Sequence, residues 1–170
     1  MSDQKVLIAG IDPGKNGGAI ILDNFGNIIA KSPMFMIDKS EFDSTAYSYF
    51  LKNDQYQVDH VVVERVTAMP KNGVVSMFHF GMAFMFCQVV PKMLSIPMTL
   101  VTPQAWQKVM HMGIDKTLDP KQRSLIAFSR LYPDTDLRMT SRCKNQHDGL
   151  VDALLLAEWG RRTLKLDTYK

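Results

Sequence analysis

Four acidic residues stand where carboxylates could do chemistry. Asp12 ends the apolar run from Val6 to Ile11, and Glu64 ends a second short apolar run. Asp148 and Asp152 are four residues apart in a stretch of helical pattern, so their carboxylates project from the same helix face. If the fold brings all four together, they repel one another unless cations lie between them. Oxygen ligands suit Mg²⁺ or Mn²⁺, and two such ions about 4 Å apart can stabilise both the attacking and the leaving oxygen in phosphodiester hydrolysis.

Each acid also has an ordinary structural explanation. Asp12 could open an Asp-Pro-Gly turn, Glu64 could be an exposed charge at a strand end, and Asp148 suits the N-cap of the last helix. Asp152 is harder to explain in this way, because its neighbours are apolar and burying an unpaired carboxylate is costly. His147 could cap the helix, transfer a proton or bind a metal; we expect a supporting position beside the ligands.

The elements that must position these acids can be predicted from hydrophobic patterns. The run from Val6 to Ile11 is apolar at both parities, which is typical of a central strand buried on both faces. Two further runs, 19–22 and 27–31, predict a meander of three antiparallel strands with the first. Short strands at 60–63 and 99–101 then alternate with helices, which predicts a mixed α/β sheet covered by helices. The expected helices are 44–55 with Ser44 or Thr45 as its cap, 76–90, 103–110 capped by Thr102, 120–132 capped by Asp119, and 147–162.

The helix predicted at 76–90 is apolar nearly all round. This pattern predicts burial against the sheet, and against a second subunit if one is present. Six of the twelve methionines lie between Met69 and Met98. Because flexible thioethers suit both irregular cores and adaptable interfaces, either use is open, and core filling is the expected one.

Composition sets broad limits on the class of protein. With 170 residues and 46% hydrophobic content, we expect one compact domain spanning 1–170. A net charge of +3 permits a polyanionic partner without requiring one. Cys87 and Cys143 have no zinc-type spacing and are expected to be free thiols. The N-terminal residues lack the pattern of a signal peptide and no apolar stretch is expected to span a bilayer, so we expect a cytoplasmic protein without a membrane partner.

Several motifs, taken in order, resemble the RuvC-type Holliday junction resolvases of the ribonuclease H-like nucleases, and particularly the small phage-encoded branch. They are GIDPG at 10–14, VVVE at 61–64, MPKNG at 69–73 leading to FHFG at 78–81, VTPQAW at 101–106, the helix start at Lys121, and DGLVDALLLAEW at 148–159. The resemblance implies a ribonuclease H-like mixed five-stranded sheet, with three antiparallel strands plus parallel strands, flanked by helices. It also implies a crossover junction endodeoxyribonuclease.

The resemblance implies a metal site with two Mg²⁺ ions, for which Mn²⁺ would substitute. Asp12, Glu64 and Asp152 match the family's metal ligands, and a fourth ligand is expected near the start of the last helix. Cellular members commonly place that ligand three residues before the last acid, but Gly149 stands there. Asp148 is therefore assigned as the fourth ligand from one residue earlier, with His147 as the alternative.

A second departure concerns the contact with bases. Cellular members carry an aromatic residue shortly after the strand-end glutamate, which wedges against bases at the crossover. Here that position is Thr67, with Met69 as a possible replacement. The preferred DNA structure and cleavage sequence are therefore open.

The substrate implied by the resemblance is branched DNA in phage recombination, repair, replication or packaging, in the host cytoplasm if the protein is phage-encoded. Lysine and arginine side chains would hold it mainly through phosphates. Cutting a four-way junction symmetrically requires two sites related by a twofold axis, which implies a homodimer. The residues expected to contact DNA are Arg65, Lys71, Lys116 and Lys121, with Lys108, Arg123, Arg142 and Lys144 as further basic candidates.

Three other functions were weighed. A broader structure-specific nuclease that cuts forks and flaps would use the same acids, and the sequence does not separate it from a resolvase. The strand opening at Asp12 also resembles actin-like sugar kinases and ATPases, but those chains are much longer and have a second domain. A catalytically silent protein that binds branched DNA would not need four acids, one of them in an apolar helix.

Overall fold

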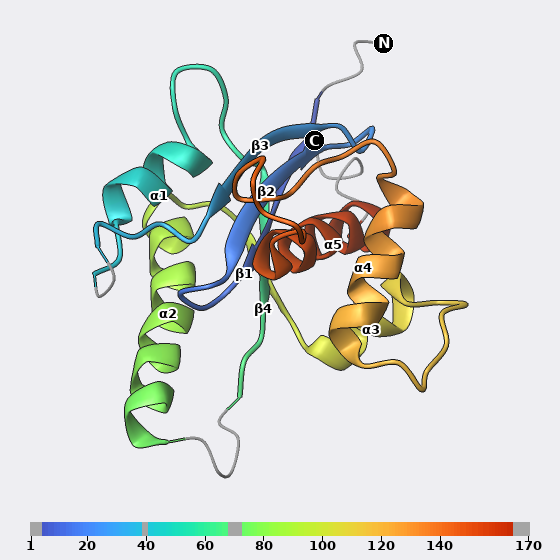
Figure 1. The fold of residues 1–170 in the computed structure, drawn as a ribbon. Coiled ribbons are helices and arrows are strands. Elements are labelled where there is room, and N and C mark those ends of the chain that lie inside the picture. Colours follow the sequence, from blue (N-terminus) through green and yellow to red (C-terminus); the bar gives the residue numbers. More distant parts are fainter. Residues whose placement is uncertain (1–4, 39–40, 68–72, 165–170) are drawn as a thin grey trace.

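One mixed sheet organises the molecule. The computed structural model describes residues 5–38, 41–67 and 73–164, and its strands lie in the order β3-β2-β1-β4-β5 (Figure 1). Strand β1 is antiparallel to β2, and β2 to β3, whereas β4 and β5 continue the sheet in parallel on the other side of β1. The expected fold class, with an antiparallel meander and a central first strand, is confirmed. The strands are β1 (Leu7–Asp12), β2 (Gly18–Asp23), β3 (Ile28–Pro33), β4 (His60–Glu64) and β5 (Met98–Val101).

Helices cover both faces of this sheet. Strand residues of alternate parity supply the two cores: Ile8 and Val62 pack with α3, α4 and α5, whereas Ile11 and Val63 pack with α1 and α2. Figure 1 shows α2 on one side of the strands and α3, α4 and α5 on the other. The helices are α1 (Ser44–Leu51), α2 (Val74–Met93), α3 (Pro103–Met110), α4 (Pro120–Leu131) and α5 (Asp148–Thr163).

Side-chain caps set where these helices begin. Thr102 caps α3 and Asp119 caps α4, as predicted. The predicted cap of α1 was wrong: Asp43 caps it by accepting a hydrogen bond from the Ala46 amide at 2.9 Å. Aspartate is as good an N-cap as serine or threonine, so the helix starts one position after the first suitable residue.

Helix α2 is less buried than its composition predicted. Only its inner side, including Ala83, Cys87 and Val90, enters the core, while large apolar side chains such as Phe78 and Met85 are more than half exposed. Among the described helices, α2 is long and apolar enough to cross a membrane, which was not expected. Core helices of globular proteins pass the same test of length and composition. The inner side of α2 packs with the sheet, and its outer side is exposed.

Candidate active site

Asp12 and Glu64 come together because their strands are parallel neighbours. The register pairs Ile11 with Val63, so the two acids follow at the same level of the sheet. Side chains two residues apart point to the same face of a strand, and Ile8 and Val62 both face α5. Both carboxylates therefore lie at the carboxyl ends of β1 and β4, on the side covered by α5.

Glycines bring α5 close to this edge. A Cβ atom on Gly10 would overlap the backbone of Ala153 and Ala157, and one on Gly149 would overlap the backbone of the β1–β2 turn at Asn16 and Gly17. Helix α5 consequently packs backbone against backbone on β1. This contact places Asp152, which lies between Gly149 and Ala153 in the sequence, beside the end of β1.

The electrostatics show that the four predicted acids share one site. Burial raises the pKa of Asp12 well above its ordinary value, and the negative charges of Asp152, Glu64 and Asp148 raise it further, against a smaller opposite effect of Lys121. Burial also raises the pKa of Asp152 to about 6, with Asp148 adding to the rise. The pKa of Glu64 is raised chiefly by burial and partly by Asp152. A cluster of carboxylates with these shifts favours protons or cations.

Two residues that the sequence did not single out, the aromatic Trp106 and the polar Ser124, act on the acids. The indole of Trp106, 1% exposed, donates a hydrogen bond from Nε1 to Glu64 Oε1 at 2.7 Å. The Ser124 side chain on α4 lowers the pKa of the Asp152 carboxyl against the effect of burial. Trp106 stands in the VTPQAW motif, whose place in the family pattern could have pointed to it; Ser124 gave no signal in the sequence.

Lys121 and His147 lie on either side of Asp148. The Lys121 ammonium bonds Asp148 Oδ2 at 2.8 Å, in a pair whose side chains are both more than half exposed. His147, not Asp148, is the N-cap of α5, because its Nδ1 accepts from the Leu150 amide at 3.2 Å. This corrects the expected cap role of Asp148. As the first residue of the helix, Asp148 keeps its carboxylate available to the site.

The donor set suits a divalent metal of the Mg²⁺ class. All four acids offer oxygen ligands, and Asp152 Oδ1 is buried without a hydrogen-bond partner. Within the described ranges, no three His, Cys, Asp or Glu side chains already stand around a common point at metal-binding distance. The residues fit the ion by chemistry and charge.

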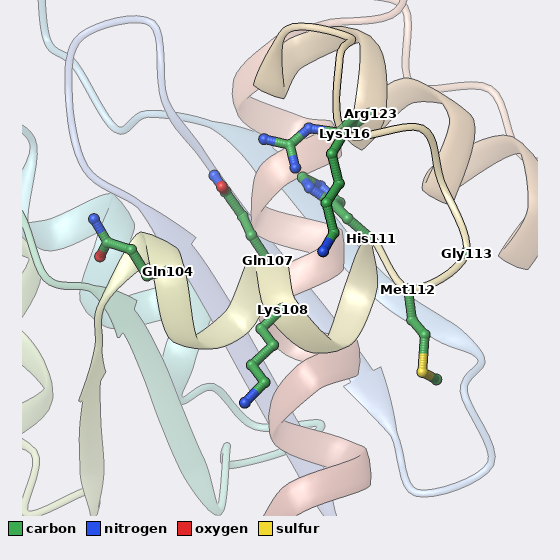
Figure 2. A pocket seen from close by; sticks show the side chains of 8 residues that line it. All are labelled: Gln104, Gln107, Lys108, His111, Met112, Gly113, Lys116 and Arg123. Carbon is green, nitrogen blue, oxygen red and sulfur yellow. The ribbon is translucent and has the colours of Figure 1, made fainter.

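Some of the basic residues predicted to contact DNA line three hollows, two of which also include one of the acids. Arg65 and Thr67 line a cavity of about 260 Å³ together with Glu64 and the ring of Phe80. Lys116 lines a second cavity, of about 530 Å³, between α3 and α4 (Figure 2). A third, of about 540 Å³, is lined by Lys144 with His147 and Asp148. Lys71 and Met69 lie outside the described residues.

Phe80 is an aromatic residue that the sequence analysis did not assign to the site. It lies on α2, is half-buried, and its ring would lie 3.9 Å from a Cβ atom on Gly14, in the turn after Asp12. Thr67, where cellular resolvases carry an aromatic, is exposed. The ring that lines the cavity together with Glu64 therefore comes from α2.

Comparison with known proteins supports the fold. The sequence matches no protein-family model and no curated protein. The structure resembles T. thermophilus RuvC in complex with a Holliday junction substrate, with a TM-score of 0.61, 13% identity, and coverage of 92% of this chain and 95% of that one. It also resembles a Thermus thermophilus RuvC structure, with a TM-score of 0.56, 15% identity, and coverage of 92% and 96%. At this identity the likeness shows a shared RuvC-type fold.

Proposed function

We propose that the protein is a metal-dependent endonuclease that resolves Holliday junctions or other branched DNA by phosphodiester hydrolysis. The observation that carries this proposal is the convergence of Asp12, Glu64 and Asp152 from two strands and a helix, with each pKa raised. Such a cluster is stabilised by cations and is poorly suited to a purely structural role. The shared fold with a protein solved on a Holliday junction supports the substrate class.

Asp12, Glu64, Asp148 and Asp152 would hold two Mg²⁺ ions, or Mn²⁺ in their place. Bound there, the ions would supply an activated water and stabilise the leaving 3′ oxygen. Within the chain, the Trp106 indole fixes the orientation of Glu64, and Ser124 does the same for Asp152. The Lys121 ammonium offsets the charge of Asp148 and is placed to meet a phosphate. His147 holds the start of α5 and has its second ring nitrogen for proton transfer.

DNA contact is assigned to Arg65, Lys71, Lys116 and Lys121 through phosphates. Phe80 adds a ring at the cavity beside Glu64, where a base next to the cleaved phosphate could stack. We place the activity in phage DNA recombination, repair, replication or packaging, in the host cytoplasm, as the resemblance implies.

A homodimer through α2 would supply the second active site. Its exposed apolar side chains are spaced three and four residues apart, which is the pattern of a helix that pairs with another helix. We assign the partner that packs against α2 as a second copy of this chain, because symmetric cutting needs two identical active sites. The residues of this apolar seam are Val75, Phe78, Met82, Met85 and Val89.

The proposal is tested by incubating the protein with labelled four-way junctions, forks, flaps and linear duplex, in Mg²⁺, Mn²⁺ or EDTA. We expect metal-dependent cleavage of the junction, and Asp12→Asn and Asp152→Asn variants that bind junctions without cutting them. Asp54→Asn, at an exposed position, is the matched control and should cut normally. Absence of cleavage of every substrate would reject the enzyme and leave a branched-DNA-binding protein. Equal cutting of flaps and junctions would favour the broader structure-specific nuclease.

The fourth metal ligand is identified by comparing variants of Asp148 and His147. Asp148 is assigned because its carboxylate is free of capping, whereas His147 Nδ1 is engaged with the Leu150 amide. Asp148→Asn is therefore expected to lose cleavage and His147→Gln to retain a large part of it. The opposite order of the two activities would transfer the assignment to His147.

A further inference from the structure

The cavity between α3 and α4 is cationic on several sides. Figure 2 shows the Lys116 and Arg123 side chains reaching over His111 and Gln107, while Lys108 points away from them on the other side of α3. The volume is about 530 Å³, which is ample for a phosphate group. None of the described residues that line it is acidic.

The positive charges here lack protein partners. Neither Lys116 nor Arg123 has an ion pair among the described residues. Arg123 Nε is buried without a hydrogen-bond partner, and so is Nδ1 of His111, a side chain only 5% exposed. Buried polar groups are nearly always paired, so two such groups at one cavity indicate that a ligand completes them.

His111 connects this cavity to the catalytic acids. Its Nε2 lies 3.2 Å from Ser124 Oγ, and the Ser124 side chain lowers the pKa of the Asp152 carboxyl. Its ring also meets the edge of Trp106, with centroids 5.4 Å apart, and Trp106 holds Glu64. A ligand at His111 would therefore contact a side chain that itself touches Ser124 and Trp106, the two residues that act on the proposed metal ligands.

We propose that this cavity binds a backbone phosphate of the DNA, one that is not itself cleaved, through Lys116, Arg123 and His111. The assignment of the phosphate to DNA rests on the proposed nuclease function. The binding of a phosphate as such rests on the residues of the cavity alone. An anion favours the doubly protonated imidazole, in which both ring nitrogens donate. Without a ligand, burial and the nearby Arg123 lower the pKa of His111 to about 4. Phosphate binding should therefore raise it.

The test follows the His111 ring by NMR in EDTA while inorganic phosphate, or a short single-stranded oligonucleotide, is added. We expect saturable shifts with both, and a rise in the pKa of His111. Lys116→Ala and Arg123→Gln should weaken binding by about tenfold, because each removes a charge-assisted hydrogen bond. Each should also reduce the slope of log affinity for junction DNA against log salt by about 1. Lys52→Ala, exposed on the opposite helical layer, is the matched control.

Absence of saturable shifts with phosphate would overturn the proposal, as would Lys116→Ala and Arg123→Gln variants that bind like the wild type. Shifts with phosphate but none with the oligonucleotide would show an adventitious ion only and would overturn the assignment to DNA. If the oligonucleotide shifts His111 while no substrate is cleaved with Mg²⁺, the nuclease fails and the phosphate site stands.

Discussion

At the scale of residues, the site is built from acids whose environment works against their charge. Asp12 and Asp152 are half-buried and feel the charges of other acids, and both pKa values are raised. Without metal, the folded protein therefore holds carboxylates that would ionise more easily in the unfolded chain. The unfavourable ionisation of these carboxylates in the folded protein indicates a site for cations, in which residues serve function at the expense of stability.

Asp152 should make stability fall with rising pH in the metal-free protein. Its pKa is about 6 when folded, against an ordinary 3.8, so the folded state binds more protons between these values and loses stability as the pH rises through them. In EDTA at pH 8, Asp152→Asn should unfold at a higher urea concentration than the wild type. Its free energy of unfolding should be larger by on the order of 2 kcal/mol, and at pH 3 the two free energies should be equal. Asp54→Asn should show no such difference, and a less stable Asp152→Asn at pH 8 would contradict the expectation.

Trp106 tests whether the orientation of Glu64 matters. Trp106→Phe keeps an aromatic ring in the core but removes the indole donor to Glu64. We expect a need for 10- to 100-fold more Mg²⁺ to reach half-maximal cleavage, as is usual when a partner of a metal ligand is lost. Trp159→Phe, at the other tryptophan, should leave the Mg²⁺ requirement unchanged. Equal Mg²⁺ curves for both variants, with melting temperatures recorded alongside, would remove Trp106 from the site.

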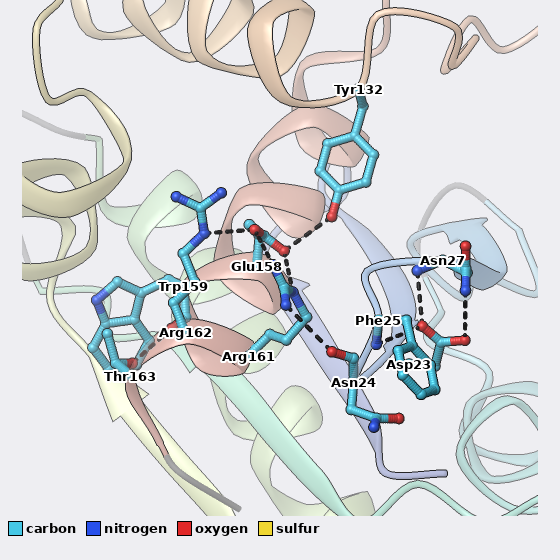
Figure 3. Close-up of polar contacts among 10 residues, drawn as sticks. All are labelled: Asp23, Asn24, Phe25, Asn27, Tyr132, Glu158, Trp159, Arg161, Arg162 and Thr163. Atoms are coloured by element: carbon cyan, nitrogen blue, oxygen red, sulfur yellow. Dashed lines mark hydrogen bonds and ion pairs between the residues drawn. The ribbon is translucent and has the colours of Figure 1, made fainter. Parts of the chain in front are cut away.

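At the scale of elements, α5 is held at both ends. Near the acids, Gly10 and Gly149 allow backbone contact with β1 and its turn. At the far end, Glu158, 2% exposed, accepts hydrogen bonds from Tyr132, the C-cap of α4, and from Arg161 and Arg162 (Figure 3). Arg161 also donates to the Asn24 carbonyl in the β2–β3 turn at 3.3 Å. The helix that carries Asp148 and Asp152 is therefore fixed against both the sheet and α4.

Gly10→Ala should damage this packing. The new Cβ would meet the backbone of Ala153 and Ala157, which cannot move as a flexible side chain can. We expect a loss of about 1–3 kcal/mol in the free energy of unfolding, and weaker Mg²⁺ binding because Asp152 is displaced. Gly81→Ala is the matched control: apart from its chain neighbours and its own helix backbone, no described atom would lie within 4 Å of the new Cβ, so helix propensity should stabilise that variant by up to about 1 kcal/mol. Equal effects of the two changes would reject the close contact as the cause.

These elements also show what the sequence could and could not predict. Hydrophobic alternation and helix caps identified the strands and most helices, because those signals are local. The positions of Asp12 and Glu64 at strand ends predicted that both acids belong to the site. The contact of α5 with Gly10 is between distant segments and has no local signal. The sequence did not decide which residue is the N-cap of α5, because both His147 and Asp148 are able to cap a helix. Trp106 and Ser124 touch the acids only through tertiary packing.

At the scale of the whole molecule, α2 leaves an apolar seam that no other part of the described chain covers. Composition predicted burial, but hydrophobicity does not say which molecule covers a helix. Patches of this kind on a soluble domain are uncommon unless they meet another surface. The three-and-four spacing from Val75 to Val89 suits a helix from a second copy, which would set two active sites about a twofold axis.

Phe78→Glu tests that arrangement. Phe78 is 66% exposed in the seam, and Phe25, 63% exposed in the β2–β3 turn, allows the same substitution away from α2. A charge in the seam leaves two like charges facing each other without water, so we expect the dimer to weaken by on the order of 30-fold or more, measured by analytical ultracentrifugation. On a plasmid with an extruded cruciform, the variant should accumulate nicked circles, because the two cuts lose their coupling, whereas Phe25→Glu should yield linear product like the wild type. A Phe78→Glu protein that still sediments as a dimer would place the interface elsewhere.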